Sequence, residues 1–254
     1  MLFSSVTFLS ILALAFAAPA TVPTAKHETL LSRNLNSLLT AILNAAPGLE
    51  GDINDITGIL TATEALLAVV TGTQTTYNEL ATKACTAYTI IFARGTSEPG
   101  NVGILAGPPL FDALKSLVGS SALTIQGVND YSASVEGFLE GGDPAGSAEM
   151  AAQIEAALTK CPNTKLAIGG YSQGGQIVHN AAAMLPAATA AKISSVVIFG
   201  DPDNGKAVAN VDSSKVLVVC HAGDDICLGG DLILLPHLTY AEDATTAASF
   251  IVAA

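Results

Sequence analysis

Apolar runs of strand length alternate with longer segments of helical periodicity from Cys85 to the end of the chain. The runs are rich in β-branched residues and are apolar throughout, which is typical of strands buried on both faces. The predicted strands are Ala87–Phe92, Leu123–Val128, Leu166–Ile168, Ser195–Phe199 and Val216–Val219. The predicted helices are Gly103–Val118, Ser147–Lys160, Gln173–Leu185 and Ala241–Val252.

This alternation of strands and helices indicates an α/β fold. Strands that are linked by helices form a parallel sheet, and right-handed connections place helices on both faces of it. We therefore predict a three-layer α/β/α sandwich around a parallel sheet of about five strands. This domain spans residues 85–254.

The segment from residue 18 to 84 has a different composition, with apolar clusters at helical spacing and no cysteine. We predict two or three short amphipathic helices, interrupted at Pro47, Gly48 and Gly58. The segment is interpreted either as a pro-region, with Arg33 as a candidate processing point, or as a helical extension packed on the main domain.

The first residues, MLFSSVTFLSILALAFAAPA, form an apolar run that ends in small residues. Ala15-Phe16-Ala17 fits a signal-peptidase site, and the run is short for a membrane span. We predict a signal peptide over residues 1–17 and a secreted, extracellular protein. Because no second apolar run of spanning length is apparent, we expect the mature chain to be soluble. We also expect a monomer without a membrane partner.

The charge balance excludes one class of partner. The chain has 10 Lys and Arg against 22 Asp and Glu, a formal net charge of -12, and no basic cluster. A nucleic-acid partner requires a basic face, so we expect none.

The four cysteines predict two disulfides, because a secreted chain oxidises its thiols. Cys220 and Cys227 flank a short Gly-Asp-Asp loop and are paired with each other, which leaves Cys85 with Cys161. A zinc site is disfavoured because the chain has no CxxC or HxxxH spacing.

The spacing Gly170-x-Ser172-x-Gly174 lies between a predicted strand and a predicted helix. It fits two interpretations: a nucleophilic serine on a sharp turn, or one polar residue in a glycine-rich loop. The strand predicted before this segment and the helix predicted after it favour the first interpretation. At such a sharp turn, the flanking glycines avoid steric clashes. The helix that begins at Gln173 would direct its N–H groups toward the same space.

A serine nucleophile needs a histidine base and an acid that orients the histidine. His179 follows Ser172 by two helical turns and cannot reach it, so we interpret it as a partly exposed helix residue. His237, which follows Pro236, is preferred to His221 as the base because the order Ser, Asp, His is typical of α/β hydrolases.

The acid is expected in CHAGDDIC, where Asp224 and Asp225 are equally placed by spacing. The oxyanion donors expected are the backbone N–H of Gln173 and Thr96, in the loop after the first domain strand. In the same loop, Arg94 and Glu98 either pair with each other and brace it or are solvated.

Four segments together resemble the signature blocks of the fungal cutinases: FARGTSEPGN, KCPNTKLAIGGYSQGG, CHAGDDIC and PHLTY. The resemblance covers residues 85–252. It implies a minimal α/β hydrolase with five central parallel strands and without a large lid. It also implies the same two disulfides and these site residues: nucleophile Ser172, acid Asp224, base His237, and oxyanion donors Thr96 and Gln173.

The resemblance implies a secreted serine esterase that hydrolyses cutin or similar apolar polyesters, of plant cuticle type, and short-to-medium acyl esters. No cofactor or metal is expected. Apolar residues of two loops are predicted to form the rim of an open cleft: Val135, Phe138, Leu139, Ile233 and Leu234. Two alternatives are an acetylxylan esterase or other carbohydrate deacetylase, and a non-enzymatic surface-active or effector protein on the same scaffold.

Overall fold

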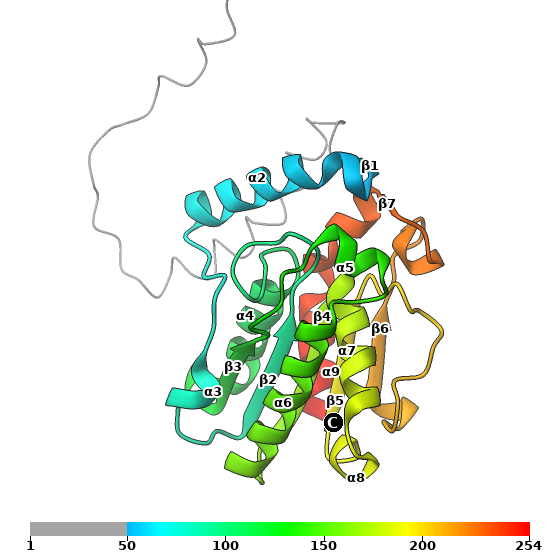
Figure 1. Cartoon of the computed structure of the whole chain (residues 1–254). Helices are drawn as coiled ribbons and strands as arrows, with labels where there is room; N and C mark the ends of the chain where they lie inside the picture. The colour runs from blue at the N-terminus through cyan, green and yellow to red at the C-terminus, as the bar shows by residue number, and fades with distance from the viewer. Residues whose placement is uncertain (1–49) are drawn as a thin grey trace, which may run out of the picture.

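The computed structural model describes residues 50–254, and its centre is a five-stranded parallel sheet (Figure 1). The strand order is β3-β2-β4-β5-β6, and all neighbouring pairs are parallel. The strands are β2 (Tyr88–Ala93), β3 (Leu123–Gly127), β4 (Lys165–Tyr171), β5 (Ser195–Phe199) and β6 (Val216–Val219).

Helices cover both faces of this sheet, as Figure 1 shows. Helices α4 (Gly107–Val118) and α9 (Ala244–Ala253) pack on each other against one face. Helices α6 (Pro144–Lys160) and α7 (Gln173–Met184) pack on each other against the opposite face. The predicted three-layer α/β/α architecture is confirmed.

Shorter helical elements connect these layers. The α-helical turns are α3 (Glu79–Thr82), α5 (Val135–Leu139) and α8 (Ala187–Ala190). The 3-10 turns are η2 (Ser120–Ala122), η3 (Ser213–Lys215), η4 (Ile226–Leu228), η5 (Leu235–Leu238) and η6 (Tyr240–Asp243).

The core has two halves, one on each face of the sheet, and strand β2 contributes to both. Ile90 and Phe92 pack with the residues of α4 and α9, whereas Ile91 and Ala93 pack with those of α6 and α7. All four are at most 1 % exposed. Because successive side chains of a strand point to opposite faces, a strand covered on both sides must be apolar at every position.

The two disulfides close a long and a short segment. Cys85, ahead of β2, is bonded to Cys161 at the end of α6, with Cα atoms 5.4 Å apart. Cys220, after β6, is bonded to Cys227, seven residues further on. These are the pairs that the sequence analysis expects.

The N-terminal part of the described chain packs on the domain as a long helix, α2 (Ile53–Thr71). It runs through Gly58, where the sequence analysis wrongly places a helix break. Its first residue follows β1 (Gly51–Asp52), which pairs antiparallel with β7 (Leu232–Ile233). The predicted signal peptide, Arg33 and the break at Pro47-Gly48 lie outside the described residues.

Helix α2 is long and apolar enough to cross a membrane by length and composition alone, contrary to the expectation that no second such run exists. Core helices of globular proteins share this property. Three residues of α2 (Ile53, Ile56 and Leu67) belong to the core, and each is at most 5 % exposed. The helix therefore lies across the domain in this structure.

Replacement of Phe111 by alanine should test the α4 side of the core. Phe111 is fully buried and packs edge-on against Phe92 and Tyr77, with ring centroids 5.7 and 5.4 Å away. Phe111→Ala should lower the free energy of unfolding by about 3–5 kcal/mol in urea titrations. Leu117→Ala, on the exposed side of α4, should cost about 1 kcal/mol or less. Equal losses would contradict this packing.

Candidate active site

Ser172 occupies the turn between strand β4 and helix α7, in a backbone conformation rare for residues other than glycine. Its φ is 55° and its ψ is -123°. The turn is held by two backbone hydrogen bonds, from the Ser172 N–H to Phe199 O (2.9 Å) and from the Gly175 N–H to Ser172 O (2.7 Å). A positive φ at a residue with a Cβ is strained, and such strain concentrates at functional sites.

The glycines on either side of Ser172 are required by close backbone packing. A Cβ at Gly170 would lie 2.1 Å from Gly174 O, and a Cβ at Gly174 would lie 2.1 Å from Ala93 O. Since both contacts are to backbone, neither glycine can be replaced without displacing β2 or the turn. The spacing singled out in the sequence is thus a steric requirement of the turn.

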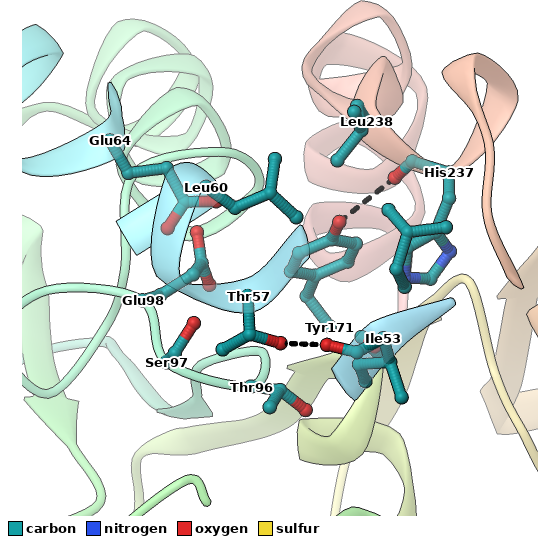
Figure 2. A pocket seen from close by; sticks show the side chains of 12 residues that line it. Ile53, Thr57, Leu60, Glu64, Thr96, Ser97, Glu98, Tyr171, His237 and Leu238 are labelled. Carbon is teal, nitrogen blue, oxygen red and sulfur yellow. Dashed lines mark hydrogen bonds between the residues drawn. The ribbon is translucent and has the colours of Figure 1, made fainter. Parts of the chain in front are cut away.

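His237 lies in η5, and its ring packs against the last residue of β4. The Tyr171 ring stacks on the imidazole with centroids 5.1 Å apart, and its hydroxyl donates to His237 O at 2.9 Å (Figure 2). His237 and Ser172 line the same pocket and are 1 % and 3 % exposed. Within residues 50–254, no atom hydrogen-bonds His237 Nε2.

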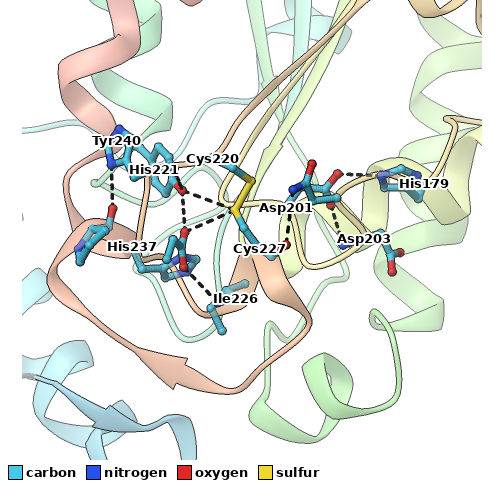
Figure 3. The surroundings of a disulfide bond; sticks show 12 residues. His179, Asp201, Asp203, Cys220, His221, Ile226, Cys227, His237 and Tyr240 are labelled. Atoms are coloured by element: carbon cyan, nitrogen blue, oxygen red, sulfur yellow. Dashed lines mark hydrogen bonds and ion pairs between the residues drawn. A yellow bond between two sulfur atoms is a disulfide. The ribbon is translucent and has the colours of Figure 1, made fainter.

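Asp224 holds the other nitrogen of this imidazole, because its Oδ2 lies 2.8 Å from His237 Nδ1. The aspartate sits inside the loop closed by the Cys220–Cys227 disulfide, which Figure 3 shows. Its Oδ1 accepts from the Ile226 N–H at 3.0 Å. Burial raises the pKa of Asp224, but the hydrogen bonds from His237, Tyr240 and the Ile226 N–H, together with the electrostatic interaction with the His237 ring, outweigh burial and hold this pKa below its usual range. An ionised carboxylate can only accept, so His237 carries its proton on Nδ1 and a lone pair on Nε2.

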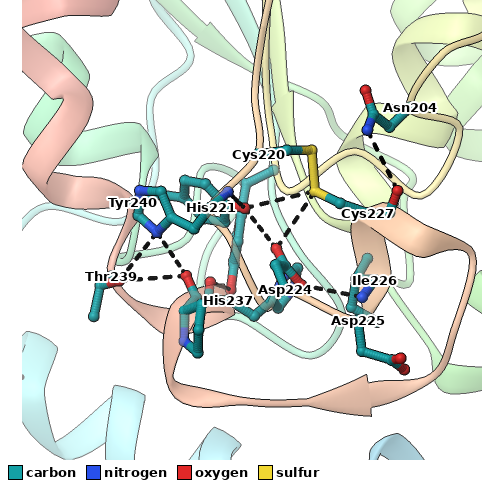
Figure 4. A network of polar contacts seen from close by, with 12 residues as sticks. Asn204, Cys220, His221, Asp224, Asp225, Ile226, Cys227, His237, Thr239 and Tyr240 are labelled. Carbon is teal, nitrogen blue, oxygen red and sulfur yellow. Dashed lines mark hydrogen bonds and ion pairs between the residues drawn. A yellow bond between two sulfur atoms is a disulfide. The ribbon is translucent and has the colours of Figure 1, made fainter.

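Tyr240 is a second donor to the same carboxylate oxygen, and sequence reasoning did not identify it. Its hydroxyl donates to Asp224 Oδ2 at 2.5 Å and accepts from the His221 N–H at 3.0 Å (Figure 4). Tyr240 is 1 % exposed, and burial together with the Asp224 charge raises its pKa. Tyr240 therefore positions Asp224 and stabilises its charge.

Asp225, the other aspartate that the spacing allows, points away from His237. Its Oδ2 accepts from the Leu232 N–H at 3.0 Å, and its carboxylate packs against Gly230. His221 is also occupied, with Asp243 Oδ2 2.7 Å from its Nε2 and Pro236 O 2.8 Å from its Nδ1.

His179 corrects an expectation, because it is buried rather than partly exposed. Its side chain is 8 % exposed, and its Nε2 lies 2.9 Å from Oδ2 of the fully buried Asp201 (Figure 3). Asp201 comes from the segment after β5, and its Oδ1 accepts from the Asp203 N–H. The pair links α7 to that segment.

Thr96 and Gln173, the two expected oxyanion donors, are brought together by a side-chain contact. Gln173 Nε2 donates to Thr96 Oγ1 at 3.0 Å and to Ser134 O at 2.7 Å. Gln173 is the first residue of α7, and Thr96 lines the pocket beside Ser172. The Gln173 side chain thus joins the loop after β2 to the start of α5, a link that the sequence did not indicate.

The loop that carries Thr96 is braced by two buried charged residues, which do not pair through their side chains as one expectation held. Glu98 accepts from three backbone N–H groups, those of Gly95, Ile104 and Leu105, at 2.8 to 2.9 Å. Arg94 donates from Nε to the backbone carbonyl of Glu98 at 2.8 Å. Both residues are buried, so the alternative of solvated side chains is also wrong.

Helix α2 covers the pocket that Ser172 and His237 share. Four of its residues line this pocket from above: Ile53, Thr57, Leu60 and Glu64. Figure 2 shows these side chains on the ribbon that crosses the site. The absence of a large lid, which the resemblance implies, therefore needs correction, because a 19-residue helix occupies that place.

Both ends of this cover are attached to the domain. At its start, the β1–β7 pairing places Gly51 opposite Ile233 and Asp52 opposite Leu232. Beyond its end, Thr75 O accepts from the Asn101 and Val102 N–H groups. The outer surface of the helix is apolar over several turns, with these exposed residues: Ile59, Leu66, Val69 and Val70.

The predicted cleft rim is only partly where the sequence places it. Ile233 lines the pocket, whereas Leu139 is exposed on α5 and is not among the residues that line it. Phe138 is instead a buried core residue (6 % exposed), and Val135 packs against the same core. Leu234 directly precedes η5 and is half-buried. The two loops therefore form less of an open rim than expected, since α2 lies over them.

The parallel sheet and the strained serine between β4 and α7 define an α/β hydrolase. The chain belongs to the cutinase family, whose model matches residues 84–254. It is similar to cutinase pbc1 of Pyrenopeziza brassicae, with 59 % identity over 187 residues that cover 74 % of this chain and 90 % of the relative. A cutinase of Hypocrea jecorina is 61 % identical over 168 residues, 66 % of this chain and 67 % of the relative. The protein is accordingly a carboxylic ester hydrolase.

The solved structure of Trichoderma reesei cutinase in complex with a C11Y4 phosphonate inhibitor matches with a TM-score of 0.72 and 50 % identity. It covers 86 % of this chain and 98 % of that chain. Residues 84–254 make up a smaller part of the chain than this 86 %, so the match to the solved structure also includes part of the segment before residue 84. An acetyl xylan esterase structure, 20 % identical with a TM-score of 0.54 over 67 % of this chain and 99 % of that chain, shares the fold.

The ionised Asp224 should make stability depend on pH. A lowered carboxyl pKa stabilises the fold above the unfolded value, about 3.9, and this contribution is lost as pH falls through the lowered pKa. Asp224→Asn should therefore lose about 1–3 kcal/mol of unfolding free energy at pH 7 and less at pH 3. Asp130→Asn, at an exposed position, is the control. If Asp224→Asn lost the same free energy of unfolding at both pH values, the lowered pKa of Asp224 in the folded protein would be contradicted.

Proposed function

We propose that the protein hydrolyses apolar esters by acyl transfer through Ser172, His237 and Asp224. One observation carries this proposal: Ser172 shares a pocket with His237, whose Nδ1 is hydrogen-bonded to the buried Asp224. The serine supplies the nucleophile, the histidine takes up its proton, and the aspartate orients the histidine and stabilises its positive charge.

The first half-reaction moves one proton and one acyl group. His237 Nε2 takes the proton of Ser172 Oγ while Oγ bonds to the ester carbonyl carbon, which gives a tetrahedral oxyanion. The intermediate collapses as the alcohol leaves with the proton from Nε2, so that Ser172 carries the acyl group. Water then attacks the acyl-enzyme by the same route and releases the acid.

The oxyanion would bind to the backbone N–H groups of Thr96 and Gln173. The helix dipole at the start of α7 adds positive potential at this point. The Gln173 side chain supports this arrangement, because its bond to Thr96 Oγ1 holds the two donors in a fixed relation. Glu98 and Arg94 hold the loop that carries Thr96 through hydrogen bonds to its backbone, which limits movement of this loop during the reaction.

An apolar acyl chain is the substrate feature that the pocket favours. Its lining includes four aliphatic side chains: Ile53, Leu60, Ile233 and Leu238. The similar proteins are named cutinases, which supports cutin-like polyesters and related acyl esters as substrates. Acetylated xylan is not favoured, since the likeness to acetyl xylan esterase concerns the fold alone.

We also propose that the protein is secreted and acts outside the cell. The predicted signal peptide over residues 1–17 supports this location. The two disulfides are typical of proteins that fold in an oxidising compartment.

Replacement of Ser172 by alanine tests the nucleophile. Ser172→Ala should lower kcat/KM on p-nitrophenyl butyrate by at least about 10³-fold, because no other hydroxyl takes this position. Circular dichroism and Tm should match the parent protein. Ser249→Ala, an exposed serine of α9, should retain full activity. Hydrolysis that survives in the folded Ser172→Ala protein would overturn the proposal.

Replacement of Tyr240 by phenylalanine tests the positioning of Asp224. Without this donor the carboxylate is more basic and favours protonated His237, so the acid limb of the kcat/KM profile should move to higher pH. We expect a shift of up to about one pH unit. Tyr77→Phe, in the core away from Asp224, should leave the limb in place. An unchanged limb in Tyr240→Phe would rule out this positioning role.

A further inference from the structure

Glu64 is a carboxyl group buried in the cover helix and aimed into the pocket. It lies on the inner face of α2, is 5 % exposed, and its Oε2 has no hydrogen-bond partner within residues 50–254. Its carboxyl group lies next to that of Glu98 in Figure 2, and both residues line the pocket with Ser172. Neither the acyl-transfer chemistry nor the packing of α2 accounts for an acid at this position.

Glu98 and Glu64 are held very differently although both are buried. Glu98 accepts three backbone N–H hydrogen bonds, which stabilise its negative charge. No such donor reaches Glu64 Oε2, so its charged form lacks compensation in the closed arrangement. Removing an unpaired charge from water is costly, and a second carboxylate nearby adds repulsion.

The groups around Glu64 supply no positive charge that would offset this cost. The other titratable side chains that line the same pocket are Glu98 from the loop after β2, Tyr171 from β4 and His237 from η5. Helix α5, which packs against α2, carries Glu136 on its exposed side. His237 is committed to Asp224, and none of the ion pairs formed by residues 50–254 includes Glu64.

We propose that α2 is a proton-controlled cover: protonated Glu64 allows the helix to lie over Ser172, and ionised Glu64 drives it away from Glu98 and opens the site. Burial, followed by the charge of Glu98, raises the pKa of Glu64 well above its usual value, which agrees with a closed form that retains the proton. When the helix moves, the carboxylate reaches water and its charge is solvated.

The direction of the pH effect follows from proton linkage. The closed form binds one proton more than the open form above the ordinary glutamate pKa, about 4.3. The ratio of open to closed protein should therefore rise with pH, by up to about tenfold per pH unit, until Glu64 is also ionised under the helix. The site is thus more accessible at neutral than at acid pH.

Access to Ser172 can be measured with a small water-soluble organophosphate, diethyl p-nitrophenyl phosphate, and intact-protein mass spectrometry. The labelling rates of the full chain and of its Glu64→Gln variant are compared from pH 4 to 8. Their ratio cancels the protonation of His237, which both proteins share. It should be near one at pH 4 and should rise above about pH 4.3, because glutamine cannot ionise.

Two further variants keep the test sharp. Asp55→Asn removes an exposed acid from the same helix and should follow the parent protein at every pH. Glu64→Met, which is similar in volume and also cannot ionise, should behave like Glu64→Gln and serves if glutamine impairs folding. A parent-to-variant ratio that stays constant with pH in both Glu64 variants would overturn the proposed cover.

The inference rests on the proposed function because the probe reports a reactive Ser172, but the two fail differently. A parent protein that is not labelled at any pH, or is labelled at another residue, contradicts the nucleophile itself. Labelling at Ser172 with a constant ratio contradicts only the role of Glu64.

Discussion

The close backbone packing around Ser172 is the constraint on which the rest of the site depends. Gly170 lies against the carbonyl of Gly174, and Gly174 lies against that of Ala93, so β2, β4 and α7 meet without intervening side chains. This contact holds the serine at a positive φ and brings the start of α7 beside the loop after β2. The surrounding groups, from Thr96 to His237, are placed relative to that fixed point.

The layers of the fold could be predicted from the sequence because a strand that is buried on both faces is apolar at every position. Strand β2 must supply Ile90 and Phe92 to one core and Ile91 to the other, and such a run has no polar interruption. The end of β4 was less visible. Gly169 and Gly170 resemble the start of a loop in the sequence, but both pair with β2 and β5 as part of strand β4. Glycine is needed at these positions because Phe92 and the turn leave no room for a Cβ.

The site was predictable where chemistry restricts the residue type and not where geometry alone decides. Motif spacing and chain order singled out Ser172 and His237, and the structure places both residues in one pocket. A tyrosine such as Tyr240 can serve many purposes, and only the folded disulfide loop brings its hydroxyl to Asp224. Helix α2 is apolar on both its inner and its outer side, so its pattern did not indicate which side faces the domain.

The attachment of α2 at both ends has a kinetic consequence. The helix is tied by the β1–β7 pairing at one end and by Thr75 at the other, so it remains beside Ser172 even when displaced. Its inner face then acts as a tethered ligand of the pocket, with an effective concentration set by the tether rather than by the amount of protein. An ester must compete with that local concentration, and dilution of the enzyme does not weaken the competition.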